Sequence, residues 1–211
     1  MGPERLPLLL LPGLDGTGKL FARFAAELPG NIEPTVIPLP AEPRPGLERL
    51  ASAMRERLPI GRPYALLAES FSGPVAIRLA AEQPPDLVAL VHAFREAVRE
   101  TAPAVLAARV STALDADEAR ALAACRVPVL YVGGARDRLL RPGIPAELKH
   151  LRPAMELRIL DAPHLVLQRE PVESARVVSG FLARAGAGRG ATGVGGLGIG
   201  SLEELRCRRS D

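Results

Sequence analysis

The sequence contains no tryptophan, and aromatic residues make up only 3% of its 211 residues. A core with so few rings must be packed from aliphatic side chains, and apolar residues account for 47% of the chain. A chain of this length buries roughly 70% of the surface that it exposes when unfolded. We therefore expect one self-sufficient domain built on leucine, valine and alanine.

Cysteines and long apolar runs are equally scarce. The two cysteines, Cys125 and Cys207, allow one disulfide at most, and their spacing matches no metal-binding motif. We therefore predict no metal and no cofactor. The apolar segment Leu6–Leu11 is too short to span a bilayer and lacks the layout of a signal peptide. We expect a cytoplasmic protein without stable membrane insertion, or a chain from which a leader has been removed.

The excess of positive over negative side chains is small, because the formal net charge is only +3. Part of this excess lies at the C-terminus, in Arg206, Arg208 and Arg209. No basic stripe is interleaved with aromatic residues, which argues against a nucleic-acid partner. Nothing in the pattern bears on the oligomeric state.

Six short apolar runs alternate with segments of helical pattern. The runs are Leu6–Leu11, Pro34–Leu39, Tyr64–Ala68, Leu87–His92, Val127–Val132 and Met155–Leu160. The helical segments are Thr17–Leu28, Leu47–Leu58, Gly73–Gln83, Ala93–Ala124, Pro145–His150 and Pro171–Ala183. This alternation predicts an α/β fold: a three-layer αβα sandwich with a mostly parallel sheet of about six strands.

The composition changes after Arg184, where glycines crowd a short stretch. Because glycine loses the most backbone entropy on ordering, we expect no regular element there beyond one turn at Ser201–Leu205. The predicted organisation is a domain over 1–184 and a flexible tail over 185–211.

A serine stands at the junction of a predicted strand and the helix that follows it. A sharp turn that exposes a catalytic serine needs small residues two positions before and after it. Ala68 and Ser72 meet this requirement around Ser70, whereas Pro74 fits badly if Ser72 is placed at the centre. The pattern therefore favours Ser70 as a nucleophile. The alternative is a serine that merely caps the next helix.

An acid and a histidine follow the last two predicted strands. Asp137 comes after the fifth and His164 after the sixth, and such loops converge on one edge of a parallel sheet. The order Ser70, Asp137, His164 is that of a hydrolase triad, in which the histidine accepts the serine proton and the acid orients the imidazole. We expect Asp161 to brace its own turn, and a catalytic role for His92 is the weaker alternative.

The glycine-rich segment Leu11–Gly18 follows the first strand. Its backbone amides are placed to stabilise an oxyanion, and we predict Leu14 and Phe71 as the two donors. A phosphate-binding loop is the rival interpretation. It is disfavoured because no serine or threonine follows Lys19 and the glycine spacing is not that of a dinucleotide site.

Together these residues resemble the α/β-hydrolase superfamily over about residues 5–184. Within it, Leu11–Gly18 and Glu69–Gly73 look like segments of small bacterial esterases and of plant phytyl ester synthases, which are acyltransferases. We also predict substrate contacts for Asp15, Glu69 and His92. A small-molecule ester is the expected partner.

The sequence departs from the family pattern at Pro12, where a histidine is usual, and in the length of 93–124, where lid helices are usually inserted. The segment 93–124 is expected to be a crossover helix or a reduced lid, and the hairpin that commonly precedes the first strand is missing. The resemblance implies hydrolysis of esters with short to medium acyl chains through an acyl-enzyme. Acyl transfer to an alcohol and a catalytically inactive binding protein are the alternatives.

Overall fold

The computed structural model describes residues 5–40, 46–93, 118–138 and 143–192 of the chain. Within these residues, six strands form one sheet in the order β2-β1-β3-β4-β5-β6, and every neighbouring pair is parallel. The strands are β1 (Leu6–Leu11), β2 (Ile32–Val36), β3 (Tyr64–Glu69), β4 (Leu87–Ala93), β5 (Val129–Gly134) and β6 (Glu156–Leu160).

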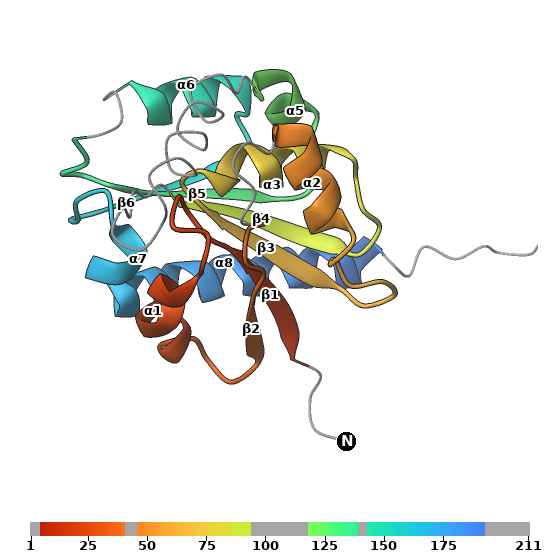
Figure 1. The fold of residues 1–211 in the computed structure, drawn as a ribbon, viewed down its shortest axis with the longest axis horizontal. Helices are drawn as coiled ribbons and strands as arrows, with labels where there is room; N and C mark the ends of the chain where they lie inside the picture. The colour runs from red at the N-terminus through yellow and green to blue at the C-terminus, as the bar shows by residue number, and fades with distance from the viewer. Residues whose placement is uncertain (1–4, 41–45, 94–117, 139–142, 193–211) are drawn as a thin grey trace, which may run out of the picture.

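Helices cover both faces of this sheet (Figure 1). One face carries α2 (Leu47–Arg55), α3 (Ser72–Ala81), α5 (Ala119–Ala124) and α6 (Ile144–Leu151). The other face carries the short 3-10 helix η1 (Lys19–Phe21), α1 (Ala22–Ala26), α7 (Val166–Arg169) and α8 (Pro171–Thr192). Helix α3 contacts β3 and β4 from the first side and α8 contacts β4 and β5 from the second. The predicted three-layer αβα sandwich with a parallel sheet is therefore confirmed.

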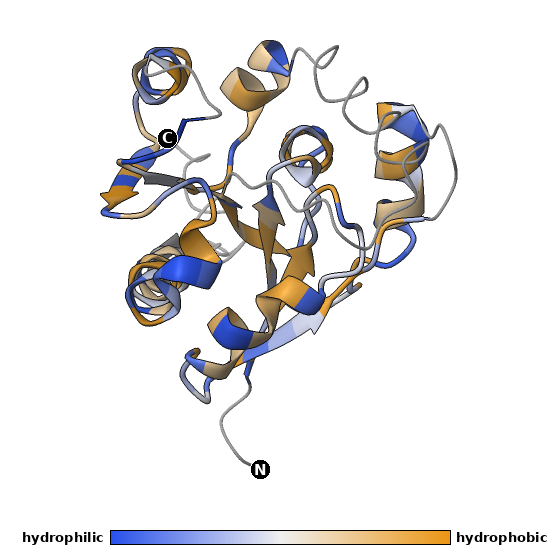
Figure 2. Ribbon diagram, turned by 60° about the vertical axis from the view of Figure 1, so that its left-hand side comes forward, coloured by the Kyte–Doolittle hydropathy of each residue, from blue (hydrophilic) through white to orange (hydrophobic). Residues whose placement is uncertain are grey.

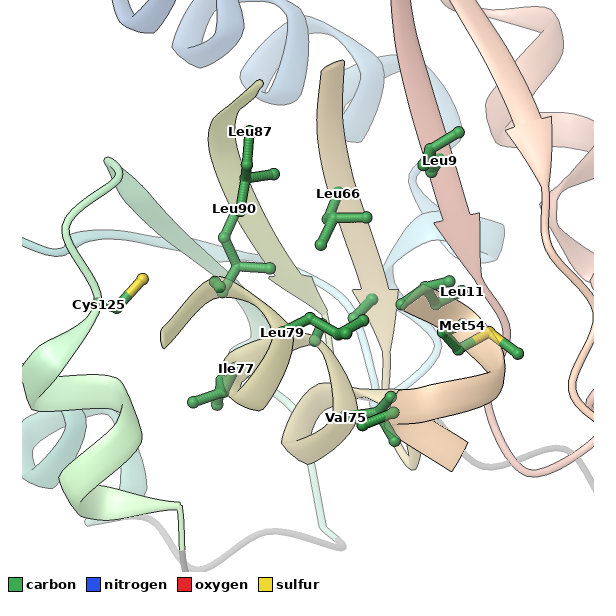
Figure 3. Close-up of a cluster of buried hydrophobic side chains, with 14 of the residues drawn as sticks. Leu9, Leu11, Met54, Leu66, Val75, Ile77, Leu79, Leu87, Leu90 and Cys125 are labelled. Carbon is green, nitrogen blue, oxygen red and sulfur yellow. The ribbon is translucent and has the colours of Figure 1, made fainter. Parts of the chain in front are cut away.

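The core is divided between the two faces because alternate residues of a strand point to opposite sides. In β1, Leu9 and Leu11 join the cluster under α2 and α3, whereas Leu8 and Leu10 join the cluster under α1 and α8. Figure 3 shows the first cluster, and Figure 2 shows that the central strands are largely hydrophobic. A strand covered on both faces needs an unbroken apolar sequence, which is what β1 has.

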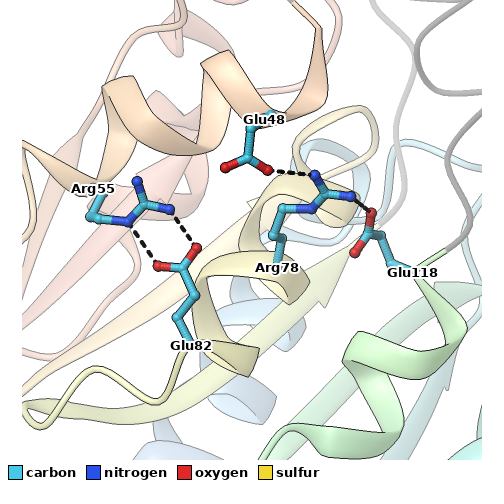
Figure 4. A network of polar contacts seen from close by, with 5 residues as sticks. All are labelled: Glu48, Arg55, Arg78, Glu82 and Glu118. Atoms are coloured by element: carbon cyan, nitrogen blue, oxygen red, sulfur yellow. Dashed lines mark hydrogen bonds and ion pairs between the residues drawn. The ribbon is translucent and has the colours of Figure 1, made fainter.

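A set of ion pairs fastens the helices of the first face to one another (Figure 4). Arg78 of α3 donates to Glu48 of α2 at 2.8 Å and to Glu118, directly before α5, at 2.5 Å. Arg55 of α2 pairs with Glu82 at the end of α3. Three helices that come from different parts of the chain are thus tied together around α3.

Most strand boundaries lie within two residues of the prediction, but β2 differs more. The predicted run was Pro34–Leu39, and the strand is Ile32–Val36. Pro34 therefore lies inside the strand and not at its start. Since β2 is an edge strand paired with β1, the proline is tolerated inside it.

The prediction that no regular element follows Arg184 is wrong for residues 185–192. Helix α8 continues to Thr192 and includes Gly186, Gly188 and Gly190. A glycine costs a helix only about 1 kcal/mol relative to alanine, and extension is easier than nucleation once a helix is packed. The buried residues Phe181 and Leu182 provide that packing.

Several predictions fall on residues outside the described part of the chain. They concern most of the crossover or lid region, residues 94–117, and the remainder of the tail, residues 193–211. Among the described helices, none has both the length and the apolarity to cross a bilayer.

Candidate functional site

The chain turns sharply at Ser70, between β3 and α3. Ser70 has a φ of 51°, in the left-handed region that residues other than glycine rarely adopt. Its amide donates to the carbonyl of Ala93 at 2.5 Å, and its carbonyl accepts from the amide of Gly73 at 2.8 Å. The sharp strand-to-helix turn predicted for this segment is present, and it presents Ser70 at the carboxyl edge of the sheet.

Two alternatives for this segment can be judged from the geometry. The N-cap of α3 is Phe71, so Ser70 lies one residue before the capping position and does not serve as the cap. Ser72 is fully buried, and its hydroxyl donates to the carbonyl of Pro12 at 2.5 Å. Ser72 therefore anchors the loop after β1 to the turn, whereas Ser70 is the serine that reaches the surface.

Asp137 and His164 meet where the loops after β5 and β6 converge. The Nδ1 atom of His164 lies 2.6 Å from Oδ2 of Asp137, and both side chains are about nine-tenths buried. A carboxylate at this distance favours the tautomer with the proton on Nδ1, which leaves Nε2 as the basic nitrogen. The two residues come from different loops, as the sequence predicted.

Gly134 allows the two loops to approach each other. A Cβ atom at this position would lie 2.4 Å from the carbonyl oxygen of Ala162. The amide of Ala135 donates to the carbonyl of Leu160, and the amide of Arg136 donates to that of Ala162. These backbone bonds hold the acid loop and the histidine loop together.

Asp161 was predicted to brace its own turn, and its role is different. Its exposed carboxylate pairs with Nε of Arg136 at 3.0 Å, and its carbonyl accepts from the same guanidinium at 2.8 Å. Asp161 therefore links the histidine loop to the acid loop. Sequence reasoning did not find Arg136, although its place directly before Asp137 was a usable signal.

His92 packs against the start of α3, at Gly73. A Cβ atom at Gly73 would come within 2.0 Å of its Nε2 atom, and its ring meets Tyr131 edge-on at 6.3 Å. The pKa of His92 is lowered to about 4, mainly because the ring is buried. A hydrogen bond with the Ser70 backbone partly opposes this effect, and the electrostatic interaction with His164 adds to it. Because the ring packs against Gly73, His92 supports the turn, and its substrate contact stays a prediction.

The low pKa of His92 predicts a loss of stability in acid. As the pH falls from 6.5 toward 4, the unfolded chain binds a proton at this residue and the folded chain does not. The free energy of unfolding should therefore decrease by about 3 kcal/mol over this range and level off below it. Urea denaturation at a series of pH values measures this slope. In the variant H92N, the pH dependence contributed by His92 should be absent. The control variant H150N, at an exposed histidine of α6, should retain it.

Asp15 and Glu69 were also predicted to contact substrate, and the structure gives both a structural role. Oδ2 of Asp15 accepts from the amides of Thr17 and Gly18 and, at 2.7 Å, from the Thr17 hydroxyl. Glu69 is 1% exposed and accepts from Gln168 of α7 at 2.9 Å. Through these contacts Asp15 shapes the loop after β1 and Glu69 holds α7 against the end of β3, and their substrate contacts stay a prediction.

The two predicted oxyanion donors lie in segments that meet at the turn. Leu14 belongs to a tight turn after β1, which is closed by a bond from the Gly16 amide to the Gly13 carbonyl. Helix α3 begins at Ser72, so the amide of Phe71 precedes the first hydrogen-bonded turn, where amides have no partner inside the helix.

Helix α7 directly follows His164 and was not predicted. Its four residues, Val166–Arg169, are too few for a helical period to show in the sequence. Among the described residues, no three histidine, cysteine, aspartate or glutamate side chains gather in a way that holds a metal ion.

Comparison with protein-family models and with curated proteins finds no match. Comparison with solved structures finds many. An enol-lactonase from Burkholderia xenovorans LB400 has a TM-score of 0.73 at 15% identity, covering 85% of this chain and 92% of that one. The α/β hydrolase MGS-MChE2, from a metagenome of lagoon sediments at Mar Chica, Morocco, has a TM-score of 0.72 at 19% identity, covering 86% and 92%. At these identities the likeness is one of fold.

Proposed function

The chain has the α/β-hydrolase fold, and from this premise we propose that it is a serine hydrolase that cleaves carboxylic esters. The observation that carries the proposal is the 2.6 Å contact between His164 and Asp137, on the sheet edge where the strained residue Ser70 stands. Residues in sparsely populated backbone conformations concentrate at functional sites. Ser70 is thus proposed as the nucleophile, His164 as the base and Asp137 as the residue that orients it.

The first half of the proposed reaction forms an acyl-enzyme. The Ser70 Oγ atom attacks the ester carbonyl carbon while its proton passes to Nε2 of His164. Asp137 keeps the other imidazole proton on Nδ1 and stabilises the imidazolium. The bond from the carbonyl carbon to the alkoxy oxygen then breaks, and His164 returns the proton to the departing alcohol.

The second half repeats these steps with water. Water gives a proton to His164 and attacks the acyl carbon, and the bond to the Ser70 oxygen breaks. His164 returns the proton to Ser70, so that a carboxylic acid leaves and the enzyme is restored. In both halves the amides of Leu14 and Phe71 are proposed to stabilise the negative oxygen, and such donors typically contribute about 3 kcal/mol each.

The proposed substrates are esters with short to medium acyl chains, because the stretch between β4 and α5 is short for a lid. The test is hydrolysis of p-nitrophenyl esters of increasing acyl length. We expect kcat/KM to be highest for the short and medium chains, with no jump in rate when the substrate begins to form micelles. A preference for long chains together with such a jump would contradict this part of the proposal.

The contact from Ser72 to Pro12 predicts that Ser72 positions the oxyanion loop. Removing the hydroxyl with S72A leaves the buried Pro12 carbonyl without this donor and frees the turn that holds Leu14. We expect kcat to fall about tenfold with little change in KM, since the loop stabilises the transition state. S72T, which keeps a hydroxyl, should recover part of the loss, whereas an increase confined to KM would contradict this role.

A further inference from the structure

An open cavity of about 670 Å³ lies beside His164. The described residues that line it are Arg136, Arg138, Pro163, His164, Arg169 and Glu170. They come from the acid loop, from the histidine loop and from the end of α7, so that three segments contribute to one concave surface. The volume is in the range of small-molecule sites.

Among the described residues, the lining of this cavity is basic, with three arginines against one glutamate. The guanidinium of Arg136 already pairs with Asp161. In the part of the chain that the structure describes, no hydrogen bond or ion pair engages the guanidinium of Arg138 or Arg169. These two side chains can therefore turn toward a ligand without giving up a partner, and arginine binds carboxylate and phosphate oxygens through paired hydrogen bonds.

The position of the cavity indicates which part of a substrate enters it. In the proposed reaction, His164 gives its proton to the oxygen of the departing alcohol, so that oxygen must lie within hydrogen-bonding distance of the imidazole. A cavity that His164 itself lines is therefore on the leaving-group side of the ester.

We propose that this cavity binds the alcohol part of the ester, and that the alcohol carries an oxyanion, a carboxylate or a phosphate, held by Arg138 and Arg169. The inference rests on the proposed function, because it assumes that His164 protonates a leaving group. It adds a preference for charged substrates that hydrolase chemistry by itself does not require.

Two aryl acetates that differ in charge test the preference. In 4-carboxyphenyl acetate the leaving group carries a carboxylate, and in its methyl ester that group is neutral. A third substrate, 4-acetoxyphenyl phosphate, distinguishes phosphate from carboxylate. The quantity to compare is kcat/KM for each anionic substrate divided by kcat/KM for the neutral one, because this ratio removes changes common to both.

The double variant R138Q/R169Q should lower this ratio about tenfold for the anion that the cavity binds, since exposed ion pairs of this kind each contribute a few-fold. Added salt should lower the wild-type ratio as well. R126Q makes the same kind of substitution, with the loss of one positive charge, at an exposed arginine before β5, at the other end of that strand, and should leave the ratio unchanged. A ratio unchanged in the double variant for both anions would overturn the inference.

The test separates this inference from the proposed function. If S70A abolishes hydrolysis of all three acetates while R138Q/R169Q leaves the ratio at its wild-type value, the cavity assignment alone fails. If S70A still hydrolyses them at the wild-type rate, the proposed function fails and the cavity assignment fails with it.

Discussion

Replacing Ser70 with alanine should lower kcat/KM for ester hydrolysis by at least about 10⁴-fold. The proposed mechanism requires an oxygen on this side chain to form the acyl-enzyme, and the other hydroxyl of the described turn, on Ser72, cannot replace it. Ser72 is fully buried and committed to the Pro12 carbonyl. The rate of p-nitrophenol release from a short-chain ester measures the effect.

The comparison with S72A shows whether the loss of rate depends on the Ser70 hydroxyl or on any hydroxyl of this turn. Both variants remove one hydroxyl from the same turn, but S72A should lose only about tenfold. Thermal unfolding of both variants establishes that each is folded before the rates are compared. A smaller loss in S70A than in S72A would exchange the roles that the geometry gives to the two serines.

Replacing Asp137 with asparagine should lower kcat by about 10³- to 10⁴-fold, with little change in KM. The carboxylate lies 2.6 Å from Nδ1 of His164 and holds the proton on that nitrogen. An asparagine amide can instead donate to Nδ1, which places the proton on Nε2 and removes the base that Ser70 needs. Kinetics of the same short-chain ester, under saturating substrate, measure the change.

Asp161 provides the matched control for this variant. It lies on the adjoining loop, and D161N makes the same chemical change at an exposed carboxylate that pairs with Arg136. Because exposed ion pairs contribute at most about 1 kcal/mol, we expect less than about a fivefold effect on kcat. Equal losses in D137N and D161N would show that the loops need both acids for their shape and would contradict an orienting role specific to Asp137.

The fold was predictable because its strands carry their signal locally. Leu6–Leu11 and Leu87–Ala93 are buried on both faces, and burial on both faces requires an unbroken apolar run. Helix α7 and the last turns of α8 were not predictable on this basis. The first is too short to show a period, and the second depends on a helix already packed against the sheet.

The candidate site was predictable to the level of loops but not of contacts. Ser70, Asp137 and His164 follow strand ends, and parallel topology alone brings such positions to one edge. His92, Glu69 and Asp15 also lie near strand ends, yet their contacts are with the backbone and side chains that shape the site. Which side of the backbone a polar side chain faces depends on packing between distant segments, as with Gly73 against His92.

The most direct test of the account is to capture the covalent intermediate. The protein is treated with a fluorophosphonate, which reacts with activated serines, and is then digested and analysed by mass spectrometry. We expect one adduct, on Ser70, in the wild-type protein and none in S70A or H164A. An adduct on another residue, or full labelling in H164A, would contradict it.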